Sequence, residues 1–398
     1  MSLGRAEREG YEVAIARTPT EVEALRPAWE RLQGTQLTSD LDWFLTTVEH
    51  DPRAERPHVV YVSREGEPQG MILGRFQDVE LRCRLGYRKL YEPAIKVVTV
   101  VNGGMLGPLV EESPSVLLSS LASSVRRGEV DALNFPAVRT QTSLSTAVSQ
   151  LSARARRSTT APRAHWRTSL PGSFDAFLEQ LSSSTRQGVK RYAKKLEKEF
   201  ADSLELRRIT SLDEVDGFFA DAEAVSAKTY QGGLGVGVRQ EDDLQRALVR
   251  LGIEKGWFRA YMLHLAGEPA AYWHGYAYRG TFRTMVPGFD PQYSKLNIGT
   301  YVLMKLVAEL CDDQETHYID WGLGDAEYKR RFGDDRWEEQ DVAVFSPTLR
   351  AMRIHTVRSV LNGGVGVGRS LVRDVGKVDR VKKVWRRRVA EQARAGSS

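Results

Sequence analysis

One short stretch of the chain concentrates side chains that transfer protons and hold anions. Residues 319–335, IDWGLGDAEYKRRFGDD, read as the end of a buried strand that is broken by glycines and continues into a short helix. A strand-to-helix turn that serves the fold alone needs only a glycine and an N-cap residue. This turn instead gathers a larger set of candidate groups: Asp320, Asp325, Glu327, Tyr328, Lys329, Arg330 and Arg331. We therefore expect the turn to close a functional site.

A second group of candidates lies at the start of an apolar helix, in the stretch YSKLNIGTYVLMKL. The start of a helix presents unpaired N–H groups and a partial positive charge, so it can bind phosphate. Gly299 would allow close approach of the backbone, while Lys295 and Thr300 add a charge and a hydroxyl. The predicted cofactor-binding residues are Lys295, Asn297, Ile298, Gly299 and Thr300. The alternative is an ordinary capped helix of the core.

A basic helical segment precedes the second group along the chain. Its cations are Arg186, Lys190, Arg191, Lys194, Lys195 and Lys198. Two interpretations stay open for this segment. It is either a solvated helix face with some acidic partners or a wall that attracts anions beside a binding site.

A glycine-rich segment, residues 228–242 (KTYQGGLGVGVRQED), follows another predicted helix. It lacks the Gly-Lys-Ser/Thr ending of a phosphate-binding P-loop. We interpret it as a mobile substrate loop, with Lys228 and Tyr230 as substrate contacts.

Two histidines flank a predicted hairpin turn with the sequence Gly-Glu-Pro at residues 267–269. A two-residue loop at Gly267 and Glu268 would place His264 and His274 on opposite faces of the hairpin. They could then not share an ion, and the sequence has no other cluster of His and Cys, so we expect no metal site. His274 is a candidate substrate contact, against the simpler interpretation of a core histidine.

The elements that must position these residues occur twice along the chain. Each copy reads as a helix, a hairpin, a strand, a second helix and a final strand. The first copy covers residues 18–33, 58–76, 95–101, 113–128 and 130–136, and the second 211–230, 257–278, 281–289, 299–313 and 316–322. Both hairpins contain Gly-Glu-Pro, at 66–68 and 267–269. This repetition predicts an internal duplication of one α/β unit.

The duplication implies two domains with flanking segments. We expect a disordered start at 1–10, a first domain at 11–151, a basic linker at 152–166, a second domain at 167–350 and a basic helical tail at 351–398. Ten basic residues face three acidic ones between Arg369 and Arg394, so the net charge of +5 arises in the tail. Packing onto the body, contact with anionic lipid and contact with RNA all stay open for this tail.

Composition indicates ordinary globular domains. Of the 398 residues, 41% are hydrophobic and 27% are charged. The chain starts without the apolar core of a secretory signal, and no apolar run reaches the roughly 20 residues that span a bilayer. Cys83 and Cys311 are far apart and form no CxxC pair. We therefore expect a cytoplasmic protein with no transmembrane segment, disulfide framework or zinc site.

The second half of the chain resembles the GNAT acyltransferases. The segments STRQGVKRYAKKLEK, LAGEPAAYWHGYAYRGTFRTMVPGFDPQY, NIGTYVLMKLVAE and YIDWGLGDAEYKRRFG carry this likeness, in that order, over residues 173–345. More narrowly, it is similar to the cellulose-biosynthesis-associated acetyltransferases (the CelD/BcsL-like group). The paired arrangement resembles the Fem-type aminoacyl transferases, which are tandem GNAT folds. Residues 294–299 keep only the last glycine of the family motif Q/R-x-x-G-x-G/A.

This resemblance implies an α/β (α+β) fold with two tandem GNAT-like domains, the first of them degenerate. Each would be a mixed, mostly antiparallel sheet flanked by helices. In such folds two parallel strands splay apart and the acyl donor enters the gap. The resemblance places Asp290 and Asp320 at the two strand ends that form this gap.

Roles follow from that placement. Asp320 is expected to be the general base, with its pKa raised by burial unless Lys329 or an arginine pairs with it. Asp290 would be a second carboxylate at the same end of the cleft. Tyr328 would be the general acid for the leaving thiolate, and Lys329 would stabilise phosphate or the oxyanion.

These roles predict an N-acyltransferase with acetyl-CoA or another acyl-CoA as co-substrate and with no metal. Its acceptor would be an amine or hydroxyl of a small molecule or saccharide, such as a cell-envelope precursor. Two alternatives stay open. One is a Fem-like aminoacyl-tRNA-dependent peptidyl transferase, with the tail or the basic helix meeting tRNA. The other is a non-catalytic GNAT pair that acts as a scaffold in polysaccharide assembly.

Overall fold

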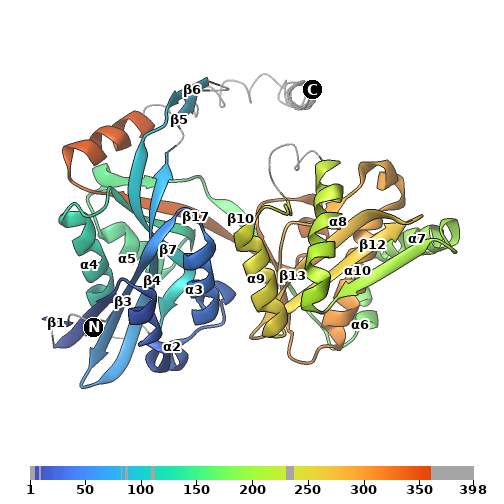
Figure 1. The fold of residues 1–398 in the computed structure, drawn as a ribbon, viewed down its shortest axis with the longest axis horizontal. Coiled ribbons are helices and arrows are strands. Elements are labelled where there is room, and N and C mark those ends of the chain that lie inside the picture. The colour runs from blue at the N-terminus through green and yellow to red at the C-terminus, as the bar shows by residue number, and fades with distance from the viewer. Residues whose placement is uncertain are drawn as a thin grey trace. The chain divides into compact units, whose positions relative to one another are not determined.

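The computed structural model describes residues 5–8, 10–81, 83–85, 88–108, 113–229 and 237–359. It divides the chain into two compact units, shown in Figure 1. Unit 1 comprises residues 1–162 together with 338–398, and unit 2 comprises residues 163–337. Residues 338–350, which the sequence led us to expect in the second domain, thus belong to unit 1. Residues 360–398 of the predicted tail lie outside the described residues.

Unit 1 is built on a twisted sheet with the strand order β1-β2-β3-β4-β7-β8-β17. Its strands are β1 (Arg5–Arg8), β2 (Tyr11–Ala16), β3 (Ala54–Arg64), β4 (Glu67–Glu80), β7 (Ala94–Leu106), β8 (Ala132–Arg139) and β17 (Asp335–Phe345). β7 and β8 are parallel, and the other neighbours in this order are antiparallel. Short strands β5 (Cys83–Leu85) and β6 (Arg88–Tyr91) form a separate pair, and β9 (Arg157–Thr159) pairs with β17.

Helices cover both faces of the unit 1 sheet. They include α1 (Pro19–Glu23), α2 (Arg26–Leu32), α3 (Leu41–His50), α4 (Ser113–Arg126) and α5 (Ser143–Gln150), and a further helix covers residues 349–359. Alternate residues of each strand point to opposite faces, so β3 contributes side chains to two hydrophobic cores, one on each face. Val60 and Val62 pack with α4 and α5, whereas Val59 and Tyr61 pack with α1, α2 and α3.

Unit 2 repeats this architecture with the strand order β10-β16-β14-β13-β12-β11. Its strands are β10 (Arg163–Ser169), β11 (Leu204–Ile209), β12 (Phe258–Leu265), β13 (Glu268–Tyr278), β14 (Thr281–Thr284), β15 (Gly288–Phe289) and β16 (Tyr318–Leu323). β14 and β16 are parallel, and the other neighbours are antiparallel. The match between the two strand orders confirms the predicted fold class, a tandem of mixed, mostly antiparallel sheets flanked by helices.

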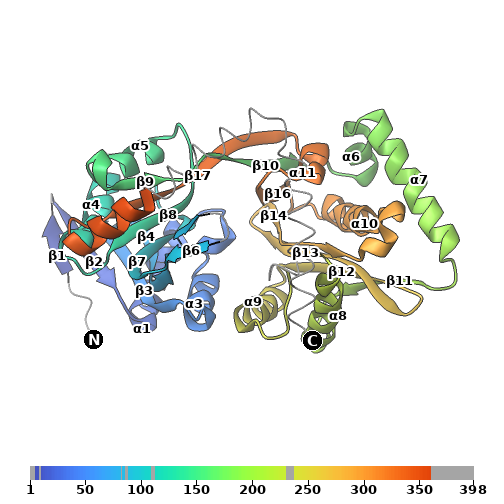
Figure 2. The same cartoon turned by 90° about the horizontal axis from the view of Figure 1, so that it is seen from above.

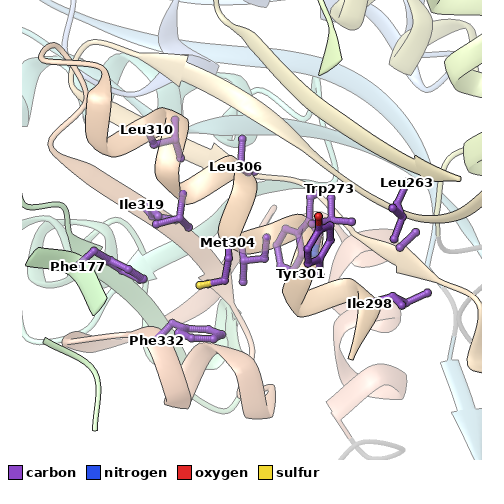
Figure 3. Close-up of a cluster of buried hydrophobic side chains, with 14 of the residues drawn as sticks. Phe177, Leu263, Trp273, Ile298, Tyr301, Met304, Leu306, Leu310, Ile319 and Phe332 are labelled. Carbon is purple, nitrogen blue, oxygen red and sulfur yellow. The ribbon is translucent and has the colours of Figure 1, made fainter. Parts of the chain in front are cut away.

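The helices of unit 2 lie on both faces of its sheet (Figure 2). They are α6 (Phe174–Gln180), α7 (Ser183–Glu199), α8 (Val215–Ala227), α9 (Asp243–Glu254), α10 (Ile298–Asp312) and α11 (Glu327–Phe332). α10 is the central helix of one face. Its side chains Ile298, Tyr301 and Met304 pack among Trp273, Ile319 and other buried residues (Figure 3). This packing fixes the start of α10 beside the ends of the central strands.

The two hairpins share details that support a duplication. Glu65 and Gly66 in one, and Ala266 and Gly267 in the other, have positive φ angles, as a two-residue type I′ turn requires. Each hairpin also has a register shift close to its turn, at Val62/Ser63 and at Leu263/His264. The turns and the shifts are therefore repeated at the same spacing as the Gly-Glu-Pro sequences.

The turn position corrects one prediction. The loop of the second hairpin is Ala266–Gly267, closed by Leu265 and Glu268, and not Gly267–Glu268. This move of the turn alone would shift cross-strand partners by two residues and keep the two histidines on opposite faces. The β-bulge between Leu263 and His264, where Ala270 is the extra residue, changes the register by one, so His274 lies opposite Ala260 and on the same face as His264. Both contact α8, His264 through Asp221 and His274 through Phe218.

Two other elements differ from their predicted form. The helix predicted over residues 18–33 is split into α1 and α2, with Pro27 in the first turn of α2. The strand predicted over residues 281–289 is split into β14 and β15. Among the described residues, no helix has the length and apolar character needed to cross a membrane.

Candidate active site

The parallel strands β14 and β16 separate in the middle of unit 2. Their last paired residues are Arg283 and Asp320. Beyond this point β15 pairs with β13, through Gly288 and Tyr272. β16 continues instead beside β10, where Gly322 is opposite Trp166. The strand ends therefore diverge, as the resemblance to GNAT folds implied.

Three aromatic side chains lie where the strands diverge. The ring of Tyr328 packs edge-on against Trp273 and Trp321, with centroid distances of 5.4 and 5.9 Å. The indole N–H of Trp273 donates to the carbonyl oxygen of Gly299 at 2.8 Å, which ties this cluster to the first turn of α10. The cluster therefore joins the diverging strand to the helix start.

Tyr328 is held as a neutral phenol. Burial raises its pKa to about 12, so the hydroxyl keeps its proton at physiological pH. Among the described residues, no side chain or backbone group forms a hydrogen bond with this hydroxyl. Tyr328 can therefore donate a proton to a bound group without breaking an existing contact.

Asp320 forms a buried pair with a histidine that the sequence did not single out. Its Oδ1 lies 2.6 Å from Nε2 of His165 on β10, and the two side chains are 12% and 5% exposed. The same oxygen accepts the backbone N–H of Gly322 at 2.7 Å. Burial favours a raised pKa for Asp320, but the contacts with His165 and the nearby charge of Arg283 outweigh it and leave the pKa below its usual value. The expected raised pKa was wrong because His165, and not Lys329 or an arginine, is the hydrogen-bonded partner.

Lys329 ties down the end of β16. Its buried ammonium donates to the carbonyl oxygens of Gly322 and Leu323, at 3.2 and 2.7 Å. Burial lowers its pKa, while the charge of Asp320 acts in the opposite direction. Lys329 is thus engaged with the turn that carries Tyr328.

The remaining charges of the turn are paired with one another. Arg330 lies 3.0 Å from Asp325, and Arg331 lies 2.9 Å from Glu327 one helical turn away. Much of the crowding seen in the sequence is explained by these local pairs. The hydroxyl of Tyr328 takes no part in these pairs.

A cavity of about 240 Å³ adjoins the start of α10. Its lining residues come from α7, the start of α10 and α11: Ser184, Thr185, Gly188, Val189, Arg191, Tyr192, Asn297, Thr300 and Arg331. Two arginines and several hydroxyls face this space, and the lining contains no carboxylate. Such a lining suits an anionic group.

The structure separates the predicted cofactor-binding residues. Asn297 and Thr300 line the cavity, whereas Ile298 is buried in the apolar core. Lys295 is exposed and does not line it. A Cβ at Gly299 would make ordinary contact with Phe289 at 3.5 Å, so packing does not require a glycine there.

Asp290 is a capping residue. Its carboxylate accepts the backbone and side-chain N–H groups of Gln292, and it lies 2.9 Å from Nζ of Lys228. Burial acts to raise its pKa, but these contacts bring the pKa below the usual value. The two predicted carboxylates therefore have different partners: Asp290 is paired with Lys228, and Asp320 with His165.

The other predicted substrate contacts are placed as follows. His274 is buried on β13 among aromatic rings, and burial lowers its pKa to about 4. This is the environment of a neutral core histidine. Tyr230 lies outside the described residues. Within those residues, no group of three or more His, Cys, Asp or Glu side chains could hold a metal ion.

Sequence reasoning missed His165 and Gly188. His165 falls in the segment predicted as a linker, which forms strand β10 in part. Its partner Asp320 is 155 residues away, so no local pattern could reveal the pair. Gly188 could have been noticed in the sequence, because a glycine inside a predicted helix is destabilising and usually has a packing or functional role.

Comparison with known proteins supports the fold. Residues 183–330 match the family model described as an acetyltransferase (GNAT) domain. A search of curated proteins finds no match. Solved structures resemble the chain over most of its length, at identities that show the fold alone.

Three of these structures illustrate the likeness. FemX is 11% identical, with 85% of this chain and 97% of that chain covered and a TM-score of 0.55. The C-terminal domain of a putative lysylphosphatidylglycerol synthetase from Agrobacterium fabrum is 12% identical, with 86% and 97% covered and a TM-score of 0.51. A tandem GNAT protein from the clavulanic acid biosynthesis pathway is 10% identical, with 85% and 99% covered and a TM-score of 0.50.

Proposed function

We propose that unit 2 is an N-acyltransferase that transfers an acyl group from acyl-CoA to an amine. Acetyl is the acyl group that we propose first. The observation that carries this proposal is the separation of β14 from β16 beyond Arg283 and Asp320. It occurs inside the segment that matches a GNAT domain, and the same segment contains the start of α10, which lines the cavity. The narrower resemblance to cellulose-biosynthesis-associated acetyltransferases favours an amino sugar or a cell-envelope precursor as acceptor.

The proposed reaction needs two proton transfers. The amine lone pair attacks the thioester carbonyl carbon and forms a tetrahedral intermediate, which collapses as the C–S bond breaks. Tyr328 gives its phenolic proton to the departing thiolate sulfur. A base removes the extra proton from the nitrogen that has attacked.

Asp320 is the base in this scheme. A carboxylate with a lowered pKa is too weak to deprotonate a sugar hydroxyl, but it can accept a proton from the strongly acidic nitrogen of the intermediate. This difference favours amines over hydroxyls as acceptors. Asp290, bound to Lys228 and Gln292, supports the loop that precedes α10.

The phosphates of the donor would occupy the cavity. Asn297 and Thr300 offer polar groups beside the first turn of α10, where backbone N–H groups favour an anion. Lys329 holds the turn that carries Tyr328. Unit 1 is proposed to be degenerate and to take no part in the chemistry, since α5, the helix after β8, reads SLSTAVSQ and has no tyrosine.

Binding and turnover test this function. We expect acetyl-CoA to raise the thermal midpoint of the full chain, and a panel of amines to release free thiol in its presence. Tyr328→Phe should lower kcat by about 10²–10⁴-fold with little change in CoA affinity. Tyr318→Phe, on the neighbouring strand, is the matched control and should behave as wild type.

Three outcomes would count against the proposal. A chain that neither binds CoA nor releases thiol would favour the scaffold alternative. Salt-sensitive binding of tRNA without binding of CoA would favour the Fem-like alternative. Full activity of Tyr328→Phe would remove Tyr328 from the mechanism.

A further inference from the structure

Gly188 in α7 has no structural explanation. A glycine inside a helix destabilises it relative to alanine because the backbone loses more freedom on folding. Close packing would justify that cost, but a Cβ at Gly188 would meet no atom within 4 Å. Its φ angle is not positive either. Gly188 does line the cavity at the start of α10.

The same face of α7 carries cations. Ser184, Gly188 and Arg191 line the cavity, and Lys195 follows one turn after Arg191 on this face. Arg191 and Lys195 are exposed. Neither forms an ion pair with any residue that the structure describes. α7 packs against α10 (Figure 2), so this cationic face borders the space where Thr300 lies.

Arg331 completes the cavity from the opposite side. It reaches the lining from α11 while its guanidinium is also paired with Glu327. The cavity therefore has an arginine on each of two elements and a bare stretch of helix backbone at Gly188. An elongated anion that carries more than one phosphate fits such a site better than a single carboxylate does.

We propose that α7 recognises the nucleotide end of acyl-CoA. The diphosphate lies against the open backbone at Gly188, between Arg191 and Arg331, and Lys195 binds the 3′-phosphate on the far side of the ribose. One helical turn, about 6 Å of axial rise, separates Arg191 from Lys195. This inference rests on the proposed function and goes beyond it, since it assigns donor selectivity to a helix outside the central sheet.

The test compares three ligands on the full chain by calorimetry: CoA, dephospho-CoA, which lacks the 3′-phosphate, and pantetheine, which lacks all phosphates. Gly188→Ala should weaken CoA binding at least about tenfold, because the methyl group keeps the diphosphate off the helix. Its thermal midpoint should be equal to or above that of wild type. Gly217→Ala in α8, where a Cβ also meets nothing within 4 Å, is the matched control and should bind CoA normally.

Lys195 is tested separately. Lys195→Gln should weaken CoA binding about five- to tenfold and leave the affinity for dephospho-CoA unchanged. Lys194→Gln, on a neighbouring face of the same helix, should change neither. Wild-type protein that binds CoA together with variants that bind it equally well would overturn the role of α7 alone. Wild-type protein that fails to bind CoA would overturn the proposed function and this inference with it.

Discussion

Replacement of His165 by leucine tests the buried pair that joins β10 to β16. The substitution removes the partner 2.6 Å from Asp320 and leaves its carboxylate with the backbone N–H of Gly322. Breaking a buried ion pair from one side typically costs about 3–5 kcal/mol, because an uncompensated charge stays buried. At 12% exposure, water cannot replace the lost partner of Asp320. We therefore expect His165→Leu to lower the free energy of unfolding by about 3–5 kcal/mol at pH 7.

Urea unfolding of the full chain measures this loss, and hydrogen exchange at Gly322 shows whether the end of β16 opens. His165→Gln, which keeps an N–H donor, should recover part of the stability. The control is Asp335→Asn, which weakens the half-exposed pair between Asp335 of β17 and Arg167, a residue of the same strand as His165. An exposed pair of this kind contributes about 1 kcal/mol or less. A loss of less than about 1 kcal/mol in His165→Leu would refute the assignment of a buried ion pair.

The pH dependence gives an independent check on the same pair. The folded-state pKa of Asp320 lies below its ordinary value of 3.8, so the folded state binds its proton less readily than the unfolded state. The contribution of Asp320 to the free energy of unfolding is therefore fully present above pH 3.8 and is lost as the pH falls through the folded-state pKa. Asp320→Asn should therefore differ most from wild type near neutral pH and least near pH 3. A difference that does not shrink in acid would show that the carboxylate charge is not the stabilising feature.

Three further predictions rest on single contacts. His274 has a folded-state pKa of about 4, below the ordinary 6.5, so its contribution to stability should decrease by up to about 3 kcal/mol as the pH falls from 6.5 to 4. His274→Phe should remove this part of the slope in urea titrations at several pH values and leave the part due to His58, whose folded-state pKa is about 3. Lys329→Met leaves the carbonyl oxygens of Gly322 and Leu323 without their donor, which should cost about 1–3 kcal/mol in urea unfolding and lower kcat more than it alters CoA affinity. Gly275→Ala would place a methyl group against the carbonyl of Arg283 and the ring of Phe282, so circular dichroism should show a strongly destabilised fold, in contrast to Gly188→Ala.

The hairpins and the central helices could be predicted because their information is local. Alternating apolar residues on each side of Gly-Glu-Pro fix two strands and a turn, and α10 has a long apolar stripe. In the second hairpin the predicted turn was one residue too late, and the bulge between Leu263 and His264 was not predicted. Ala266 takes the positive φ position that a glycine usually marks, so the sequence pattern pointed to the wrong pair of loop residues.

The pairings that complete each sheet could not be predicted from local pattern. β17 begins at the end of unit 2 in the chain, yet its residues from Glu339 to Phe345 pair with β8 of unit 1. β10 is the corresponding last strand of unit 2, and it comes from a polar, arginine-rich segment that reads as a linker. The pairing of Asp320 with His165 depends on this strand, so the true environment of Asp320 was hidden as well.

The comparison of the two units shows why the chemistry is assigned to one of them. In unit 1 the parallel pair at the point of divergence is Thr99 with Asn134, and in unit 2 the equivalent pair is Arg283 with Asp320. Gly74 and Gly275 stand at matching places beside these pairs, so the backbone geometry is retained in both copies. The residue opposite Asn134 on the outer strand is Ala343, and the residue opposite Asp320 is Arg167, whereas His165 reaches Asp320 from the position opposite Leu323. One copy thus keeps the divergence of the strands with Thr99 and Asn134 as its last pair, while the other has a buried carboxylate that is paired with a histidine. The proposed reaction would account for this difference, since the divergence of the strands is common to both copies.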